Sequence, residues 1–162
     1  MRNDRPAGPS TSGSGPSAPA IPTSPPTKCA LAAILDGLGR DDEAEQLIQE
    51  ALEVFERIAD HHEVAVCLHN LGSIYHRRAE PARAEPLYRR ALAIKERALG
   101  PDHPELATTL TNLGTLCEQR GRAAEALVFY GRAISVLEGV VEDDHPTLTV
   151  CREQQAALST RE

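Results

Sequence analysis

Apolar and small residues return at helical spacing along most of the chain. Two consecutive runs comprise Leu68, Leu71, Gly72 and Tyr75, then Ala84, Leu87, Tyr88, Ala91 and Ile94. Both runs follow the i, i+3, i+4, i+7 spacing of a helix with one buried stripe. The polar segments that follow such runs, residues 78–83 and 120–125, are short, so the helices they join must pack antiparallel. The pattern therefore predicts helical hairpins.

The hairpin pattern is repeated along the chain. Residues 69–94 align without gaps on residues 111–136 at a shift of 42, which pairs Asn70 with Asn112, Leu71 with Leu113, Gly72 with Gly114, Ala84 with Ala126, Tyr88 with Tyr130 and Ala91 with Ala133. An earlier copy fits at a shift of 40 and places Ala32, Ala44, Ile48 and Ala51 at the positions of Gly72, Ala84, Tyr88 and Ala91. Because each unit would bury its apolar face mainly against its neighbours, we expect an all-α fold, an α-solenoid of about three hairpins with a C-terminal capping helix.

The repeats also suggest where the domain lies. We expect it at residues 28–158, with units at about 28–60, 61–102 and 103–144, a half-unit at 145–158 and a short tail at 159–162. Residues 1–27 are rich in Pro, Ser, Gly, Thr and Ala and cannot bury enough apolar surface to offset the entropy lost on ordering. We interpret them as a disordered tail, a passive leader rather than a ligand for a proline-binding module.

An Asp-His pair returns in the stretches DHHE at 60–63, DHPE at 102–105 and DHPT at 144–147. Each Asp stands just before a helical pattern, and Glu63 and Glu105 follow Asp60 and Asp102 by three residues. This is the capping-box arrangement, in which the Asp accepts from a free backbone N–H and the Glu reaches back to the cap residue. We therefore interpret the pair as a helix start, with no catalytic or metal-binding role.

Composition narrows the function further. The formal charge of −7 argues against nucleic-acid binding, which needs a basic face against the phosphates. The four cysteines lie far apart in the sequence, which suggests neither a disulfide framework nor a zinc site and fits a reducing cytoplasm. No apolar stretch approaches the ~20 residues of a membrane span, and the N-terminus lacks the apolar core of a signal peptide. We expect a cytoplasmic protein without cofactor, metal, membrane or nucleic-acid partner.

The aligned units resemble a known family. The pattern NLG...Y...AE..Y..AL.I.E..LG.DHP, strongest in the two central units, is similar to the tetratricopeptide repeat in its 42-residue kinesin light chain variety. The resemblance implies a right-handed superhelix whose first helices line a concave groove for an extended peptide or partner segment. In related repeats the Asn equivalent to Asn70 and Asn112 hydrogen-bonds the ligand backbone. The family's groove positions fall on Val66, His69, Asn70, Ser73, His76 and Arg77, and on Thr108, Thr111, Asn112, Thr115, Glu118 and Gln119.

The sequence departs from two branches of that family. Chaperone-binding members hold a C-terminal carboxylate with Lys and Asn, whereas the matching positions carry Cys29 and Ala33, His69 and Ser73, and Thr111 and Thr115. The resemblance therefore does not extend to chaperone-tail binding. Kinesin light chains also have more repeats and a coiled coil for the motor, which this sequence lacks, so a motor role does not carry over.

One face of the expected groove invites a chemical interpretation. His69, Ser73 and His76 stand at i, i+4, i+7 and resemble a metal site or a nucleophile with its base, but no carboxylate at helical spacing joins them and no glycine-rich oxyanion loop is present. We prefer a polar groove lining. Cys67 and Cys117 stand near apolar helical positions and are expected to be small core residues, with a partly exposed reactive thiol as the alternative.

Charge is unevenly distributed between the units. Residues 41–63 carry nine acidic residues against one basic residue, and residues 77–97 carry seven basic against three acidic residues. Two interpretations are open: solvated helix faces, or pairing of the acidic unit of one chain with the basic unit of another. We predict a noncatalytic protein-interaction module or adaptor, with a self-associating scaffold as the alternative. An enzyme would need a convergent acid, base and pocket that the sequence does not show.

Overall fold

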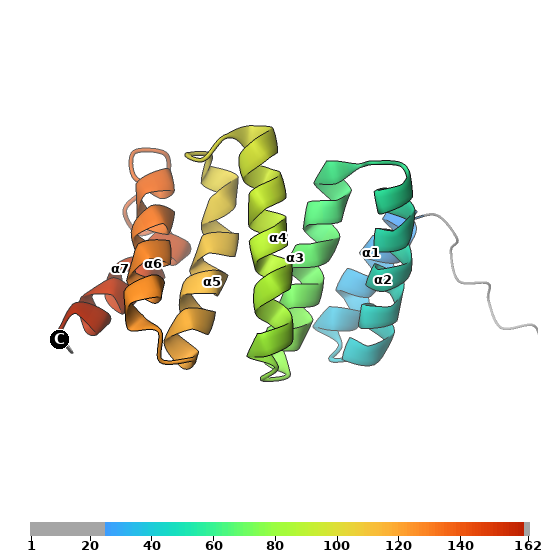
Figure 1. Cartoon of the computed structure of the whole chain (residues 1–162), viewed down its shortest axis with the longest axis horizontal. Helices are drawn as coiled ribbons and strands as arrows, with labels where there is room; N and C mark the ends of the chain where they lie inside the picture. The colour runs from blue at the N-terminus through green and yellow to red at the C-terminus, as the bar shows by residue number, and fades with distance from the viewer. Residues whose placement is uncertain (1–24, 161–162) are drawn as a thin grey trace, which may run out of the picture.

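The computed structural model describes residues 25–160, which form seven α-helices and one 3-10 turn. The elements are α1 (Pro25–Gly37), α2 (Asp41–Arg57), α3 (His61–Arg77), α4 (Pro81–Leu99), η1 (Pro104–Leu106), α5 (Ala107–Gln119), α6 (Ala123–Leu137) and α7 (Pro146–Ser159). Each helix packs mainly on the next one in sequence, which gives three hairpins in a row and a final single helix (Figure 1). The predicted all-α solenoid is confirmed.

The ends of the domain can be compared only in part with the expected boundaries. Helix α1 begins at Pro25, three residues before the expected start at Lys28. The expected disordered tail otherwise falls on residues 1–24, outside the described residues. In the described part of the chain, no helix has the length and apolar character needed to cross a bilayer.

The repeated positions build the core. Ala44, Ala84 and Ala126 are each 0% exposed, and Tyr88 and Tyr130 are fully buried beside them. The small residue at position 114 leaves room for a tyrosine ring of the second helix. A Cβ placed on Gly114 would lie 2.7 Å from a ring carbon of Tyr130. Glycine at this position is therefore required by the aromatic residue of the same hairpin.

The first Asp-His stretch starts a helix as predicted. Asp60 is the N-cap of α3, and its carboxylate accepts a hydrogen bond from the backbone N–H of Glu63 at 3.2 Å. The other half of a capping box is not formed, because the backbone N–H of Asp60 donates instead to the carbonyl of Phe55 at 3.0 Å. The cap therefore joins the end of one hairpin to the start of the next.

At the other two stretches the predicted cap residue is wrong. In the second, His103 is the N-cap of η1, and its Nδ1 accepts from the backbone N–H of Glu105 at 3.2 Å, the bond expected for Asp102. In the third, His145 is the N-cap of α7 without a side-chain cap bond, and its Nδ1 is buried without a hydrogen-bond partner among the described residues. In both stretches a proline, Pro104 or Pro146, directly follows the histidine and begins the helical segment, so the histidine occupies the cap position.

Helix α7 covers the third hairpin. Leu148, Cys151 and Leu158 are 3% exposed or less, as a capping helix requires. Val150 is 43% exposed, because it stands two residues from Leu148 and therefore points away from the third hairpin. Cys67 and Cys117 are both fully buried, which confirms them as core residues.

The uneven charges are satisfied within the chain. Arginines of one unit reach carboxylates of a neighbouring unit, in the pairs Arg77–Asp41 at 2.9 Å, Arg78–Glu45 at 2.5 Å, Arg90–Glu56 at 2.6 Å and Arg132–Glu96 at 2.6 Å. We name this set the inter-unit ion pairs. The acidic second helix of the first unit thus faces the basic residues of the second unit, so neither solvated faces nor contacts between two chains are needed to explain the charge pattern.

Candidate functional site

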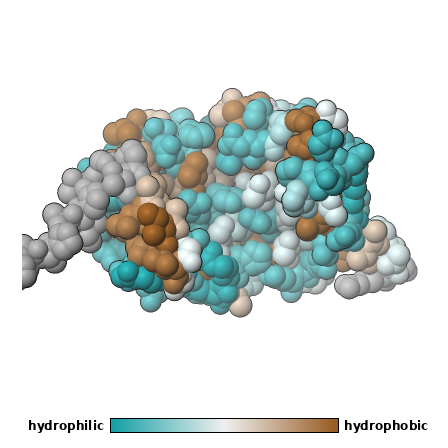
Figure 2. Space-filling view, turned by 180° about the vertical axis from the view of Figure 1, so that it is seen from behind, coloured by the Kyte–Doolittle hydropathy of each residue, from teal (hydrophilic) through white to brown (hydrophobic). Residues whose placement is uncertain are grey.

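The twelve predicted groove residues lie on two equivalent helices. Six stand on α3 and six on α5, and every one of them is half-buried or exposed. Helices α1 and α3 lie behind α2 and α4 in Figure 1, so the reverse view in Figure 2 looks onto the side they line. That side is mostly hydrophilic, and its apolar surface gathers at the N-terminal end, where Ile34 and Leu38 of α1 are exposed.

Three of the predicted residues share a hollow. His69, Asn70 and Ser73 of α3 lie opposite Ala33 and Asp36 of α1 around a space of about 150 Å³, which Ala32 and Ile48 complete. None of the twelve predicted groove residues lies on α1. The signal was present, because the shift of 40 places Ala33 and Asp36 at the positions of Ser73 and His76. The hollow therefore lies where the first helices of the first two units meet.

The side chains of Ser73 and His69 on α3 form hydrogen bonds with other groups and not with each other. The Ser73 hydroxyl donates to the carbonyl of His69 at 3.2 Å and lies 3.1 Å from the Tyr88 hydroxyl. The Nδ1 of His69 lies 3.1 Å from Oγ1 of Thr109. The serine hydroxyl is thus bonded to a backbone carbonyl and a tyrosine hydroxyl rather than to the imidazole, so the hydrogen bond of a nucleophile with its base is not formed in this structure.

The same hydroxyl pairing recurs on α5. Oγ1 of Thr115 lies 3.2 Å from the Tyr130 hydroxyl, which donates to Glu118 at 3.2 Å. Burial raises the pKa of Tyr130 to about 12, so this hydroxyl keeps its proton at neutral pH. Thr111 donates to the carbonyl of Ala107 at 2.8 Å. The hydroxyls of Tyr88 and Tyr130 thus each meet a hydroxyl of the first helix in their own hairpin, which makes this face the same in both units.

The remaining predicted residues differ in their bonding partners and in their exposure. Arg77 is engaged by Asp36 and Asp41 in the preceding unit, so its charge is already partnered. Burial raises the pKa of Tyr88, an effect that Ser73, Arg77 and Asn112 partly offset. Asn112 therefore lies near the tyrosine of the preceding unit. Val66, His76, Thr108 and Gln119 complete the two faces at half-buried or exposed positions.

His69 is expected to remain neutral well below physiological pH. Its burial, with a smaller effect from Lys95, lowers its pKa to about 4. The unfolded chain takes up a proton near the ordinary pKa of ~6.5, so stability present above that pH should fall as the pH drops towards 4. An NMR titration of the His69 ring should give a midpoint below 5 in the folded chain. The same ring in the urea-unfolded chain is the control, and equal midpoints in the two states would contradict this.

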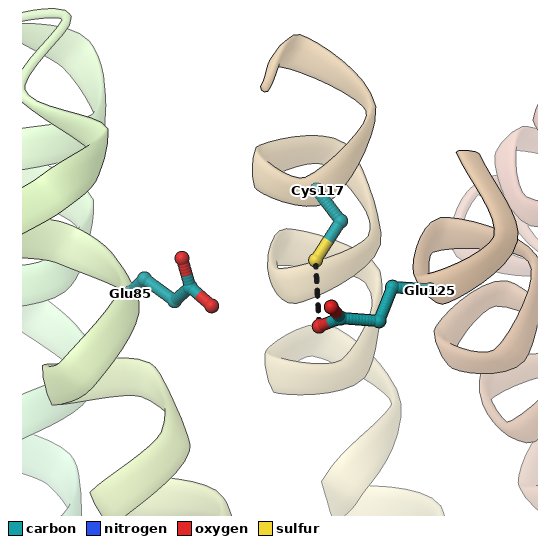
Figure 3. Close-up of side chains that lie close together, drawn as sticks. All are labelled: Glu85, Cys117 and Glu125. Atoms are coloured by element: carbon teal, nitrogen blue, oxygen red, sulfur yellow. Dashed lines mark hydrogen bonds between the residues drawn. The ribbon is translucent and has the colours of Figure 1, made fainter. Parts of the chain in front are cut away.

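One cluster outside the groove has the composition of a metal site. Ligand atoms of Glu85, Cys117 and Glu125 lie within 4.8 Å of one another (Figure 3). Arg122 and Arg120 donate to the same oxygen of Glu85 at 2.5 Å and 2.6 Å, and Arg89 donates to Glu125 at 2.5 Å. Three guanidinium groups against two carboxylates leave a local positive charge, which disfavours a metal cation.

The Cys117 thiol of this cluster also disfavours a metal site. The Cys117 thiol donates to Glu125 at 3.6 Å, and burial raises its pKa, so it stays protonated and is a poor metal ligand. The side chains of Glu85 and Arg122 instead connect the second unit to the third. We interpret the cluster as an ion-pair network that joins two units.

Comparison with known proteins identifies the repeat. The tetratricopeptide repeat profile matches residues 26–97 and 81–139, which is most of the chain. The chain belongs to the tetratricopeptide repeat family. The expected family is thereby confirmed, and the groove helices α1, α3 and α5 are the first helices of three tetratricopeptide units. No curated protein matches the chain.

Solved structures of tetratricopeptide proteins are similar in fold. BtubC (BKLC) from P. vanneervenii has a TM-score of 0.76 at 24% identity, with 84% of this chain and 55% of that chain covered. A Podospora anserina kinesin light chain with nearly identical TPR-like repeats has a TM-score of 0.71 at 18% identity, with 84% and 67% covered. The kinesin light chain likeness expected from the repeat length is confirmed. The chain spans only about half the length of BtubC, 55%.

A third similar structure is smaller. The Yersinia enterocolitica type III secretion chaperone SycD, in complex with a peptide of the translocator YopD, has a TM-score of 0.69 at 15% identity, with 84% of this chain and 92% of that chain covered. At such identities the likeness concerns the fold alone. It does show that a tetratricopeptide solenoid of similar extent binds a peptide.

Proposed function

We propose that this chain is a noncatalytic protein-interaction module of the cytoplasm that binds an extended peptide or partner segment along α1, α3 and α5. The observation that supports it most is the hollow between α1 and α3. It places the Asn70 amide beside apolar Ala33 and Ile48, the mixture of one orienting polar group and an apolar wall that peptide sites use. Asn112 occupies the equivalent position one unit further along.

The proposed ligand is short. The face of α3 that carries Asn70 is followed along the solenoid by the face of α5 that carries Asn112. The hydroxyl groups of Ser73 and Thr115 are already hydrogen-bonded to Tyr88 and Tyr130. The asparagine amides are then the groups best suited to bond a peptide backbone, while the shallow hollow accepts one small apolar side chain. A groove of this size and polarity supports affinities on the order of micromolar.

Removing both asparagine amides should weaken binding at least tenfold, since two hydrogen bonds to a ligand backbone contribute about 1 kcal/mol each. Peptides would first be selected on the full chain from a displayed random library. Their affinities for the Asn70→Ala, Asn112→Ala double variant would then be measured by fluorescence anisotropy. Glu53→Ala, Arg57→Ala is the matched control, because both residues are exposed on α2 away from the groove. Equal affinity of the asparagine variant and wild type would remove the groove proposal.

A self-associating scaffold is the second candidate, and one observation favours it. Ile34 and Leu38 of α1 are 61% and 67% exposed at the N-terminal end of the solenoid, where another helix could pack. Sedimentation over a wide range of concentration separates the two candidates. An Ile34→Ser, Leu38→Ser variant that changes the oligomeric state but not peptide affinity would favour the scaffold.

A further inference from the structure

Two cysteines from different units lie in contact. Cys29 of α1 and Cys67 of α3 are 38 positions apart in the sequence, and their Sγ atoms lie 3.7 Å apart. Both are free thiols. The other two cysteines have different neighbours, since Cys117 donates to Glu125 and Cys151 lies against Thr111. Sulfurs at van der Waals separation on two facing helices need only small side-chain rotations to reach bonding distance, about 2.05 Å.

The two thiols differ in access and in reactivity. Cys29 is half-buried, whereas Cys67 is 0% exposed. The hydrogen bond with Cys67 lowers the pKa of Cys29, and the same bond together with burial raises the pKa of Cys67. The accessible thiol is thus also the one that ionises more readily, which is the arrangement of an attacking cysteine with a resolving partner behind it.

We propose that Cys29 and Cys67 form a redox-sensitive thiol pair, which a small-molecule disulfide such as oxidised glutathione converts to a disulfide bond between α1 and α3. The Cys29 thiolate attacks one sulfur of the small disulfide, whose S–S bond breaks and releases one thiolate. The Cys67 thiolate then attacks Sγ of Cys29 and expels the second thiolate. The two released thiolates take up the two protons lost by the cysteines. The cysteine pair is thereby oxidised by two electrons, and the small disulfide is reduced by two electrons to its two thiols.

The bond would form at the edge of the hollow. Ala32 and Ala33 follow Cys29 by three and four residues on α1. His69 and Asn70 follow Cys67 by two and three residues on α3, and all four line that hollow. Oxidation would therefore fix the separation of α1 and α3 beside the groove. Any effect on a bound peptide rests on the proposed function, whereas formation of the bond does not.

The test uses the full chain with excess oxidised glutathione, followed by alkylation of the remaining thiols and mass spectrometry of the peptides. We expect a Cys29–Cys67 cross-linked peptide and a rise in Tm of roughly 10 °C that dithiothreitol reverses. Cys67→Ala should stop at a mixed disulfide on Cys29. Cys29→Ala should leave Cys67 reduced, because that thiol is buried. Cys151→Ala, a matched change at another buried cysteine, should cross-link like the wild type.

Two results would overturn the proposal. A wild-type chain that keeps Cys29 and Cys67 reduced would show that the pair does not react. A chain that retains glutathione on Cys29 would show that Cys67 does not resolve it. Because the cross-link is scored by mass, a failure of peptide binding in the asparagine variants leaves this test intact, and the two proposals can fail separately.

Discussion

Gly114→Ala should destabilise the domain by about 1–2 kcal/mol, although alanine is the better helix former. The added Cβ would lie 2.7 Å from the ring of Tyr130. That ring cannot easily move, because it is fully buried and its hydroxyl is bonded to Thr115 and Glu118. Overpacking of this kind costs roughly 1–3 kcal/mol, and the gain in helix propensity returns at most about 1 kcal/mol. Urea unfolding measures the difference.

A second glycine provides the matched control. Gly131 lies inside α6, but a Cβ there would meet only the side chain of Gln155 at 3.4 Å. Gly131→Ala should therefore stabilise the chain by about 0.5–1 kcal/mol, through helix propensity alone. The first unit suggests the rescue, because Ala32 stands there opposite Ile48. Tyr130→Ile should remove most of the cost of Gly114→Ala, and strictly additive effects in this double-mutant cycle would contradict the clash.

Glu85→Gln should cost roughly 2–3 kcal/mol at neutral pH, because this carboxylate is buried and bonded by arginines of the next unit. Glu85 is 8% exposed. The hydrogen bonds from Arg122 and Arg89 lower its pKa, whereas its burial raises it. The bond from Arg122 is the largest influence and lowers its pKa to about 2. The carboxylate is thus held in its charged form between two units. Replacing it with an amide removes the nearer counter-charge of Arg122, which keeps only its contact with Glu125 at 3.3 Å, and removes the carboxylate that pairs with Arg120.

The stability cost of Glu85→Gln should depend on pH. The folded pKa is depressed, so the stabilisation is complete above the unfolded pKa of ~4.3 and is lost as the pH falls towards 2. The difference in unfolding free energy between Glu85→Gln and wild type should therefore shrink between pH 5 and pH 2. Glu43→Gln serves as control, because its pair with Arg40 is exposed and should change stability by less than ~0.5 kcal/mol. A difference that stays constant with pH would exclude the charge as its cause.

The repeats, the helices and much of the core could be predicted from the sequence because these features depend on local periodicity. The buried Tyr88 and Tyr130 follow from spacing alone, and the unit register follows from a gap-free shift. The choice of cap residue could not be predicted reliably. His103 replaces Asp102 because the 3-10 turn begins at Pro104, which puts the histidine at the cap position.

The candidate site was predicted only in part, for a similar reason. The α3 and α5 residues of the groove come from the family pattern, but Ala33 and Asp36 of α1 lie in a unit that lacks the pattern's asparagine. The contact of Cys29 with Cys67 and the inter-unit ion pairs depend on how one unit is rotated against the next. Spacing along the chain does not contain that rotation, although the separations of 33 to 38 residues are all somewhat shorter than one repeat.

The inter-unit ion pairs bear on how cooperatively the domain unfolds. In a solenoid each unit is coupled only to its neighbours, so the sharpness of the transition measures the strength of the contacts between units. Many of these contacts are charged and half-exposed, and salt screens such charges while leaving the apolar contacts within each hairpin in place. We therefore expect the cooperativity of unfolding to depend on ionic strength, with the end hairpins fraying ahead of the middle one in concentrated salt.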